Sequence, residues 1–328
     1  MSLYGAILAG TGSAVPEKRL TNDDLSKMVD TNDEWIVQRT GIRERRIASD
    51  GETTATLASL AARRALAAAG MQPGDLDFIL CATITPEMVF PCTACFVAAD
   101  LGLQQTPACD LSAACSGFIY ALTTGASFVK SGQYRNVMII GAETLSRITD
   151  YQDRSSCILF GDGAGAVILQ RHADIKRGLI YSALHADGTG WEAMKCGPGS
   201  RQPVSRQLVD ARQQFMQIKG REVYKFAVNK FEELIRQAMR ACELTPETLK
   251  LIVPHQVNQR IIDSAMEKLG LPAEKAFVNI DKYGNTSAAS IPLALDEAIR
   301  QGKVSPGDAV IFVAFGAGLT WASAVLRA

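Results

Sequence analysis

One spacing of 173 residues recurs in this chain, and it constrains the possible folds more than any other feature of the sequence. The block AGMQPGDLDFILC resembles the block ACELTPETLKLIVP when Pro73 is aligned with Pro246. A second pair of blocks, each a helix rich in small residues followed by a turn and an apolar strand, has the same spacing when Ile140 is aligned with Val313. Two independent blocks with one spacing predict an internal duplication. The alternative is chance similarity, since βα units resemble one another generically.

The hydrophobic pattern predicts alternating strands and helices. Short apolar runs rich in β-formers predict strands over Phe78–Ala82, Val137–Ile140, Ala164–Leu169, Leu251–Val253, Ala276–Ile280, Val310–Ala314 and Ser323–Leu326, with a further buried strand in the run Leu3–Ala9. Ala- and Leu-rich runs of helical period predict helices over Thr54–Ala69, Ser116–Lys130, Gly220–Cys242, Gln259–Leu269 and Ser287–Gln301. This alternation is typical of an α/β protein with largely parallel sheets. We divide it at the duplication into an N-terminal half, residues 1–172, and a C-terminal half, residues 173–328.

Charge and cysteine content limit the classes of function. The 34 lysines and arginines balance the 34 aspartates and glutamates, so no overall field would attract nucleic acid or an anionic membrane. The apolar run near the N-terminus has no basic segment before it and is too short to span a bilayer, so we predict neither a signal peptide nor a membrane span. The eight cysteines are scattered, which favours a reducing, cytoplasmic location over a disulfide scaffold.

Neither a metal nor a dinucleotide site is predicted. Cys92 and Cys95 form a single C-x-x-C pair, and the three histidines do not add ligands at zinc spacing. The simpler interpretation is that these cysteines are small residues on a packed helix. The glycine-rich stretch 160–165, FGDGAG, precedes a predicted strand, whereas a dinucleotide-binding loop begins a helix.

Cys115 is the candidate nucleophile. It lies in the segment DLSAACSGFIYAL, directly before a predicted helix, where small neighbours let a ligand approach the backbone. The positive end of the helix dipole favours a thiolate there, and the free backbone N–H of Cys115 can bind an oxyanion. Taken alone, however, a cysteine among alanines is more often structural.

Three further elements are expected to meet Cys115. Asn285 precedes the helix of the second half that matches the helix after Cys115, and His255 follows the strand Leu251–Val253. Sites in open α/β sheets form at the carboxyl ends of strands. The turn FGAGLT, residues 315–320, can present another backbone N–H. Read singly, the histidine could be a buried structural residue, the asparagine an Asx turn or helix cap, and the turn a connection between strands.

These residues and several longer segments resemble β-ketoacyl-acyl-carrier-protein synthase III, the initiating condensing enzyme of bacterial type II fatty-acid synthesis. The resemblance covers nearly the whole chain and is carried by the cysteine segment together with DEWIVQRTGIRERR, DRSSCILFGDGAGAV, PHQVNQRII, YGNTSAAS and FGAGLTW. It implies a thiolase fold, with two duplicated halves in a layered α-β-α-β-α arrangement. Chalcone-synthase relatives share the Cys-His-Asn set but typically have GFGPG where this chain has FGAG. Thiolases use a second catalytic cysteine, for which we see no pattern here.

The resemblance also implies a role for each residue of the site. Cys115 would accept an acyl group, most simply acetyl, from acyl-CoA. His255 and Asn285 would bind the malonyl thioester carbonyl and stabilise the enolate formed as carbon dioxide leaves. The backbone N–H groups of Cys115 and Ala317 would hold the oxyanion of the condensation step. No cofactor is implied, because the coenzyme A thioesters are substrates.

Partners follow from the same resemblance. Coenzyme A would be bound by Thr31, Trp35, Arg39, Arg154, Gly220 and Asn258. Malonyl-acyl-carrier protein would dock on Arg260, and charge alone adds Lys219, Arg221 and Lys225; one basic position typical of the family is Glu267 here.

The family is homodimeric, and Phe90 would close the acyl pocket of the second subunit. Two alternatives stay open. One is the same site with a longer or branched primer in a specialised acyl pathway. The other is a non-catalytic scaffold that binds carrier protein.

Overall fold

The computed structural model describes residues 3–328, which form one nine-stranded mixed sheet and two small two-stranded sheets. The order in the large sheet is β11-β12-β13-β8-β1-β7-β6-β4-β5. Its strands are β1 (Gly5–Ala14), β4 (Phe78–Ala82), β5 (Ala108–Leu111), β6 (Asn136–Thr144), β7 (Asp162–His172), β8 (Gly178–Ala186), β11 (Leu249–Pro254), β12 (Ala309–Gly316) and β13 (Thr320–Arg327). The small sheets pair β2 (Arg19–Thr21) with β3 (Glu44–Arg46), and β9 (Met194–Cys196) with β10 (Met216–Ile218).

The α-helices are α1 (Asn22–Ser26), α2 (Asp33–Thr40), α3 (Thr54–Ala69), α4 (Thr93–Asp100), α5 (Gly117–Lys130), α6 (Arg206–Asp210), α7 (Gly220–Ala241), α8 (Gln259–Leu269), α9 (Ile280–Tyr283) and α10 (Ser290–Arg300). Two single 3₁₀ turns matter for the site, η2 (Ala114–Ser116) before α5 and η6 (Ser287–Ala289) before α10. No helix within residues 3–328 is long and apolar enough to cross a membrane.

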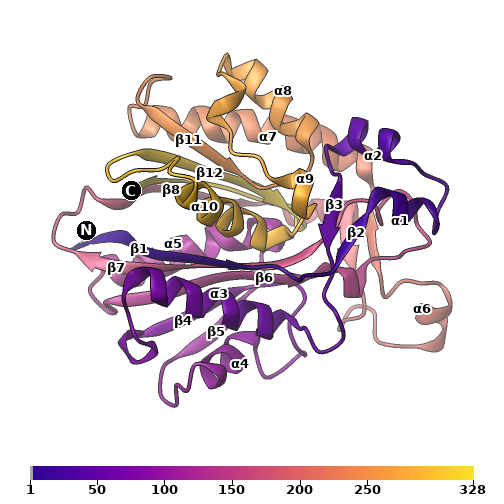
Figure 1. Ribbon diagram of the computed structural model, residues 1–328, viewed down its shortest axis with the longest axis horizontal. Coiled ribbons are helices and arrows are strands. Elements are labelled where there is room, and N and C mark those ends of the chain that lie inside the picture. Colours follow the sequence, from indigo (N-terminus) through magenta and orange to yellow (C-terminus); the bar gives the residue numbers. More distant parts are fainter. Residues whose placement is uncertain (1–2) are drawn as a thin grey trace.

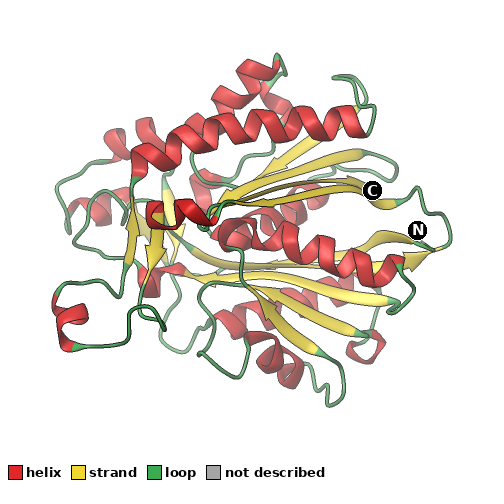
Figure 2. Ribbon diagram, turned by 180° about the vertical axis from the view of Figure 1, so that it is seen from behind, coloured by secondary structure: helices red, strands yellow, loops and turns green. Residues whose placement is uncertain are grey.

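The elements stack in five layers (Figures 1 and 2). Helices α3 and α4 cover the outer face of the group β5-β4-β6-β7-β1, and α7 and α8 cover the outer face of the group β8-β13-β12-β11. Helices α5 and α10 lie between the two groups. Within residues 3–328, the two groups of strands pair with each other only where Ala6 of β1 meets Gly178 of β8. A Cβ on Gly178 would lie 1.8 Å from the Ala6 carbonyl oxygen, so only glycine fits at this junction. The layered α-β-α-β-α prediction is confirmed.

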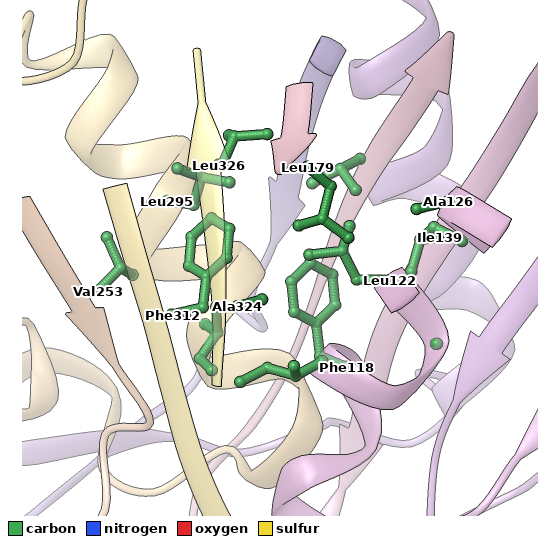
Figure 3. Close-up of a cluster of buried hydrophobic side chains, with 14 of the residues drawn as sticks. Phe118, Leu122, Ala126, Ile139, Leu179, Val253, Leu295, Phe312, Ala324 and Leu326 are labelled. Carbon is green, nitrogen blue, oxygen red and sulfur yellow. The ribbon is translucent and has the colours of Figure 1, made fainter. Parts of the chain in front are cut away.

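Both faces of the sheet strands are buried, which explains why they read as continuous apolar runs. In β12, Phe312 faces the central layer, while its neighbours Ile311 and Val313 face α7 and α8. Figure 3 shows the central layer, where Phe118 of α5 packs between the two groups of strands near Phe312.

The duplication is visible in the backbone. Strands β1 and β8 begin 173 residues apart, at Gly5 and Gly178. Ala114 and Ser287, also 173 residues apart, both have the left-handed backbone conformation, with φ of 47° and 49°. The turns η2 and η6 are therefore equivalent, and each leads into a helix of the central layer.

One predicted strand is wrong. Within Ala276–Ile280, Ala276 forms only an isolated bridge to Ile252, and Ile280 begins α9. The side chain of Gln256 takes the place of a strand ladder, because its Nε2 donates to the Phe277 carbonyl at 3.0 Å and its Oε1 accepts from the Asn279 N–H at 3.0 Å. The hydrophobic pattern also did not predict β5 or β8.

Candidate active site

Cys115 lies in the turn η2, which connects the end of β5 to α5. The left-handed Ala114 before it costs about 1–2 kcal/mol for a residue with a Cβ. Only 8% of Cys115 is exposed, and burial raises the pKa of its thiol to about 12. The prediction that the helix N-terminus favours a thiolate is therefore wrong for the free protein. Loss of hydration around the sulfur outweighs the helix dipole.

Asn285 is held by the first half of the chain. Its backbone N–H donates to the Leu159 carbonyl at 2.8 Å, and its carbonyl accepts from the Gly161 N–H at 3.0 Å. Its side-chain Oδ1 accepts the Ser287 N–H at 2.8 Å. This Asx turn occupies the acceptor end of the amide and leaves the NH₂ group as the end that can donate to a ligand.

His255 follows β11 and is completely buried. Its Nδ1 lies 2.8 Å from the Ser290 hydroxyl, while its Nε2 has no hydrogen-bond partner. The Gln256 N–H donates to the same hydroxyl oxygen at 3.4 Å, so the hydroxyl hydrogen is free to point at Nδ1. We infer that the ring proton is on Nε2. Burial lowers the pKa of His255 to about 3, so the imidazole is a neutral donor.

The two 3₁₀ turns contact each other and set the distance between the halves of the site. A Cβ on Gly117, at the start of α5, would lie 3.6 Å from the Ala288 Cβ in η6. On the other side, a Cβ on Gly316 would lie 2.7 Å from the backbone nitrogen of Cys115. Glycine at 316 thus lets the turn after β12 approach the backbone of Cys115 closely.

Cys115 lies at the junction of two cavities. One, of about 530 Å³, also contains His255 and Asn285 in its lining. The other, of about 400 Å³, is lined by Cys115, Ala317, Ser287 and a largely apolar set that includes Ile84, Leu145, Ile148, Phe160, Met194 and Met216. A group bound to the Cys115 sulfur can therefore lie in the apolar pocket while a second molecule occupies the larger cavity.

The mouth of the larger cavity is basic and aromatic. The guanidinium carbons of Arg39 and Arg154 lie 4.7 Å and 4.8 Å from the centre of the Trp35 ring. Asn258 caps α8 and donates from Nδ2 to the Arg39 carbonyl at 2.9 Å, which ties the two walls together. Arg221 and Arg260 add two more positive charges to the lining. Such a mouth suits a purine ring with phosphate groups.

The structure brings together most of the predicted site residues. Cys115, His255, Asn285, Trp35, Arg39, Arg154, Gly220, Asn258, Arg221 and Arg260 all line the larger cavity. Thr31, Lys225 and Lys219 lie outside this lining, and Lys219 is 3.8 Å from Glu192. Phe90 is 81% exposed and lines neither cavity of its own chain.

Sequence reasoning missed three polar residues around the site, Ser290, Ser287 and Glu143. Ser290 and Ser287 lie in the segment NTSAAS, but nothing in that pattern distinguishes them from ordinary helix-start residues. Glu143 lies in the apolar run of β6, where a lone acidic residue among buried neighbours is a signal that the sequence does contain.

Comparison with known proteins identifies the family of the chain. The family model described as 3-oxoacyl-[acyl-carrier-protein (ACP)] synthase III matches residues 109–188, and that of its C-terminal part matches residues 239–328. The chain is 51% identical over 322 residues to the beta-ketoacyl-[acyl-carrier-protein] synthase III of Caldanaerobacter subterraneus subsp. tengcongensis, covering 98% of this chain and 97% of the relative.

Solved structures give the same result. The crystal structure of 3-oxoacyl-[acyl-carrier-protein] synthase III from Aquifex aeolicus VF5 superposes with a TM-score of 0.91 at 48% identity, covering 99% of this chain and 100% of the other. The priming beta-ketosynthase of the R1128 polyketide biosynthetic pathway also has a TM-score of 0.91, at 35% identity, covering 98% and 96%. The chain therefore belongs to the 3-oxoacyl-[acyl-carrier-protein] synthase III family of condensing enzymes.

Proposed function

We propose that this chain catalyses a decarboxylating Claisen condensation between a short acyl-CoA primer, acetyl-CoA in the first place, and malonyl-acyl-carrier protein. The observation that carries the proposal is the position of Cys115 where an apolar pocket meets a basic cavity, with the donors His255 and Asn285 in the same lining. The names of the full-length relatives support it.

In the first half-reaction, the Cys115 sulfur attacks the thioester carbonyl of the primer, and coenzyme A leaves. The acyl group then lies in the apolar pocket. The backbone N–H groups of Cys115 and Ala317 are the proposed oxyanion donors, since both residues line that pocket and Gly316 allows their close approach.

In the second half-reaction, the malonyl thioester enters the larger cavity. The Nε2–H of His255 and the NH₂ of Asn285 donate to its carbonyl oxygen and stabilise the enolate as carbon dioxide leaves. The enolate carbon attacks the acyl carbonyl on Cys115, and the sulfur departs to give the 3-ketoacyl product. Two preorganised neutral donors suit this step because no proton has to move when the enolate forms.

A primer series tests the function directly. With malonyl-acyl-carrier protein as acceptor, we expect acetyl-CoA to acylate Cys115, observed by intact-mass spectrometry, and to yield 3-ketoacyl product with release of carbon dioxide. Acyl-CoAs of increasing length and branching then distinguish the fatty-acid role from a specialised pathway.

The acyl pocket is larger than an acetyl group requires, because its volume of about 400 Å³ corresponds to roughly a dozen water molecules. Equal or faster acylation by long or branched primers would favour the specialised pathway. The absence of both acylation and product would leave only the scaffold interpretation.

The proposed homodimer bears on primer length. Val89 and Phe90 are 96% and 81% exposed on the segment between β4 and α4, and apolar side chains clustered on a surface are typical of a protein interface. We propose that Phe90 enters the acyl pocket of a second subunit and shortens it. We further propose that the enzyme is cytoplasmic and needs no cofactor beyond its coenzyme A substrates.

Trp35 offers a test of the coenzyme A site. Replacing Trp35 with alanine removes the plane flanked by two guanidinium groups. Stacking of a base on an aromatic ring contributes about 1–3 kcal/mol, so we expect the KM for acyl-CoA to rise by about tenfold or more, with kcat little changed. Trp191→Ala is a matched control, since Lys195 and Arg201 flank that indole at 5.1 Å and 4.9 Å and it lines neither cavity. A similar KM for Trp35→Ala and the unaltered protein would place the adenine elsewhere.

A further inference from the structure

Glu143 is a completely buried carboxylate beside the active site to which the reaction described above gives no role. It lies near the end of β6. Its Oε2 accepts hydrogen bonds from the Thr85 hydroxyl at 2.6 Å, the Thr85 N–H at 3.1 Å and the Thr83 hydroxyl at 3.2 Å. The Ile84 N–H donates to Oε2 at 3.1 Å and only weakly to Oε1, at 3.3 Å. These donors fix the carboxylate through Oε2 and leave Oε1 with capacity to accept a proton.

The Ser287 hydroxyl lies beside both this carboxylate and Cys115. Ser287 and Cys115 line the same pocket, and η6 packs so closely on β6 that a Cβ on Gly141 would lie 2.2 Å from the Ala288 carbonyl oxygen. The Ser287 hydroxyl is buried, and its oxygen has no partner at hydrogen-bond geometry. It nevertheless lies close enough to the Cys115 thiol and to the Glu143 carboxyl to lower the pKa of both. The Ser287 backbone is held by the Asx turn of Asn285. An unsatisfied buried hydroxyl is unfavourable, so a structural role does not account for this one, and it is near enough to both groups to exchange a proton with each.

We propose that Glu143 stores the proton of the Cys115 thiol, received through the Ser287 hydroxyl, for as long as the acyl-enzyme exists. As the bond between Sγ and the acyl carbon forms, the thiol proton passes to Ser287 and the Ser287 proton passes to Oε1 of Glu143. The carbon–sulfur bond of the acyl-CoA breaks, and the coenzyme A thiolate takes a proton from solvent. In the condensation step, the Cys115 thiolate is expelled and regains the stored proton by the reverse route. The acyl donor in this scheme rests on the proposed function.

The acidities of the surrounding groups agree with this assignment. Burial raises the pKa of Glu143 to about 7, near the pH at which a general base works best. Burial lowers the pKa of His255 to about 3, so that ring is a weak base. Besides Cys115, the Cys81 thiol on β4 is an ionisable group near Glu143, and burial raises its pKa. Asp162 on β7 pairs with Thr144, the residue after Glu143, and its carboxylate is bound to Ser146 and to the Ala48 N–H. A base must be ionised to accept a proton, so the reactivity of Cys115 should rise with pH through about 7.

The direction of one substitution effect separates a base from a mere neighbouring charge. The negative charge of Glu143 raises the pKa of Cys115. If Glu143 acts only as that charge, Glu143→Gln makes the thiol more acidic and more reactive. If Glu143 accepts the proton, the same substitution makes Cys115 less reactive, by about 100-fold.

The experiment alkylates the purified protein with iodoacetamide between about pH 5.5 and 9 and follows the Cys115 peptide by mass spectrometry. We expect the rate in the unaltered protein to rise with an inflection near pH 7, and both Glu143→Gln and Ser287→Gly to be slower and to lack the inflection. Glycine is chosen at 287 because it accepts the left-handed backbone. Asp162→Asn, a matched buried carboxylate on the next strand, should retain the inflection.

Three outcomes would overturn the proposal. The first is Glu143→Gln reacting as fast as the unaltered protein or faster. The second is Ser287→Gly reacting normally. The third is either variant keeping the inflection near pH 7. Because the assay contains no coenzyme A, its result is independent of the acyl-transfer assay: a protein that shows the inflection but never forms an acyl-enzyme would disprove the proposed function and leave the proton store intact.

Discussion

Replacing Cys115 with alanine is expected to lower the rate of condensation by at least about 10⁴-fold while decarboxylation of malonyl-acyl-carrier protein continues. The sulfur is the atom that would hold the acyl group at the junction of the two cavities, so its loss removes the covalent intermediate. The donors His255 and Asn285 remain, and they would still stabilise the enolate, which then takes a proton from solvent. The measurements are intact-mass detection of the acyl-enzyme and separate assays of carbon dioxide and 3-ketoacyl product.

Cys242→Ala is the matched control for this substitution. Burial raises the pKa of that thiol too, but it lies at the far end of α7 and lines neither cavity. It should leave both activities unchanged. Condensation by the Cys115→Ala protein within tenfold of the unaltered rate would mean that the acyl group is carried elsewhere.

Removing either proposed enolate donor is expected to have the opposite pattern. His255→Ala should lower malonyl decarboxylation by about 10²–10³-fold and leave acylation of Cys115 by acyl-CoA largely intact, because a single oxyanion donor has that effect in comparable sites. For Asn285 the informative change is to aspartate. It preserves the oxygen that accepts the Ser287 N–H and thus the Asx turn, but it replaces the donating NH₂ with an acceptor.

The pH dependence checks the same assignment. Because burial lowers the pKa of His255 to about 3, the ring stays neutral throughout the neutral range. Decarboxylation should therefore show no inflection near the usual histidine pKa of about 6.5, and an acid limb belongs only near pH 3. Two results would show that the donor roles are wrongly assigned. One is a His255→Ala protein that loses acylation but keeps decarboxylation. The other is an inflection near pH 6.5 that this substitution removes.

Much of this architecture could be predicted because the relevant signals are local or periodic. The spacing of 173 residues predicts equivalent helix starts, and the rule that sites form at strand ends predicts that His255 and Asn285 lie near Cys115. The helices Thr54–Ala69 and Gln259–Leu269 were predicted to the residue, since both begin and end at strong signals, with an Asn or Thr before the first turn and glycine after the last.

What could not be predicted depends on contacts between distant residues. The edge segment Ala276–Ile280 reads as a strand, yet the Gln256 side chain takes its hydrogen bonds. The tautomer of His255 depends on a hydroxyl 35 residues away. The high pKa of Cys115 comes from burial by elements distant in the sequence, whereas the sequence shows only the helix beside it.

The two copies of the duplication meet at the contact between η2 and η6, and they differ there. The residue that corresponds to Cys115 in the second copy is Ala288, so each copy has a helix start but only the first has a thiol there. Asn285 is in turn held by backbone of the first copy. The proposed active site therefore lies at the contact between the two copies. In the proposed mechanism neither copy on its own holds both the nucleophile and the enolate donors. A mutation that shifts α5 against α10 would therefore be expected to separate Cys115 from His255 and Asn285 without replacing any of the three.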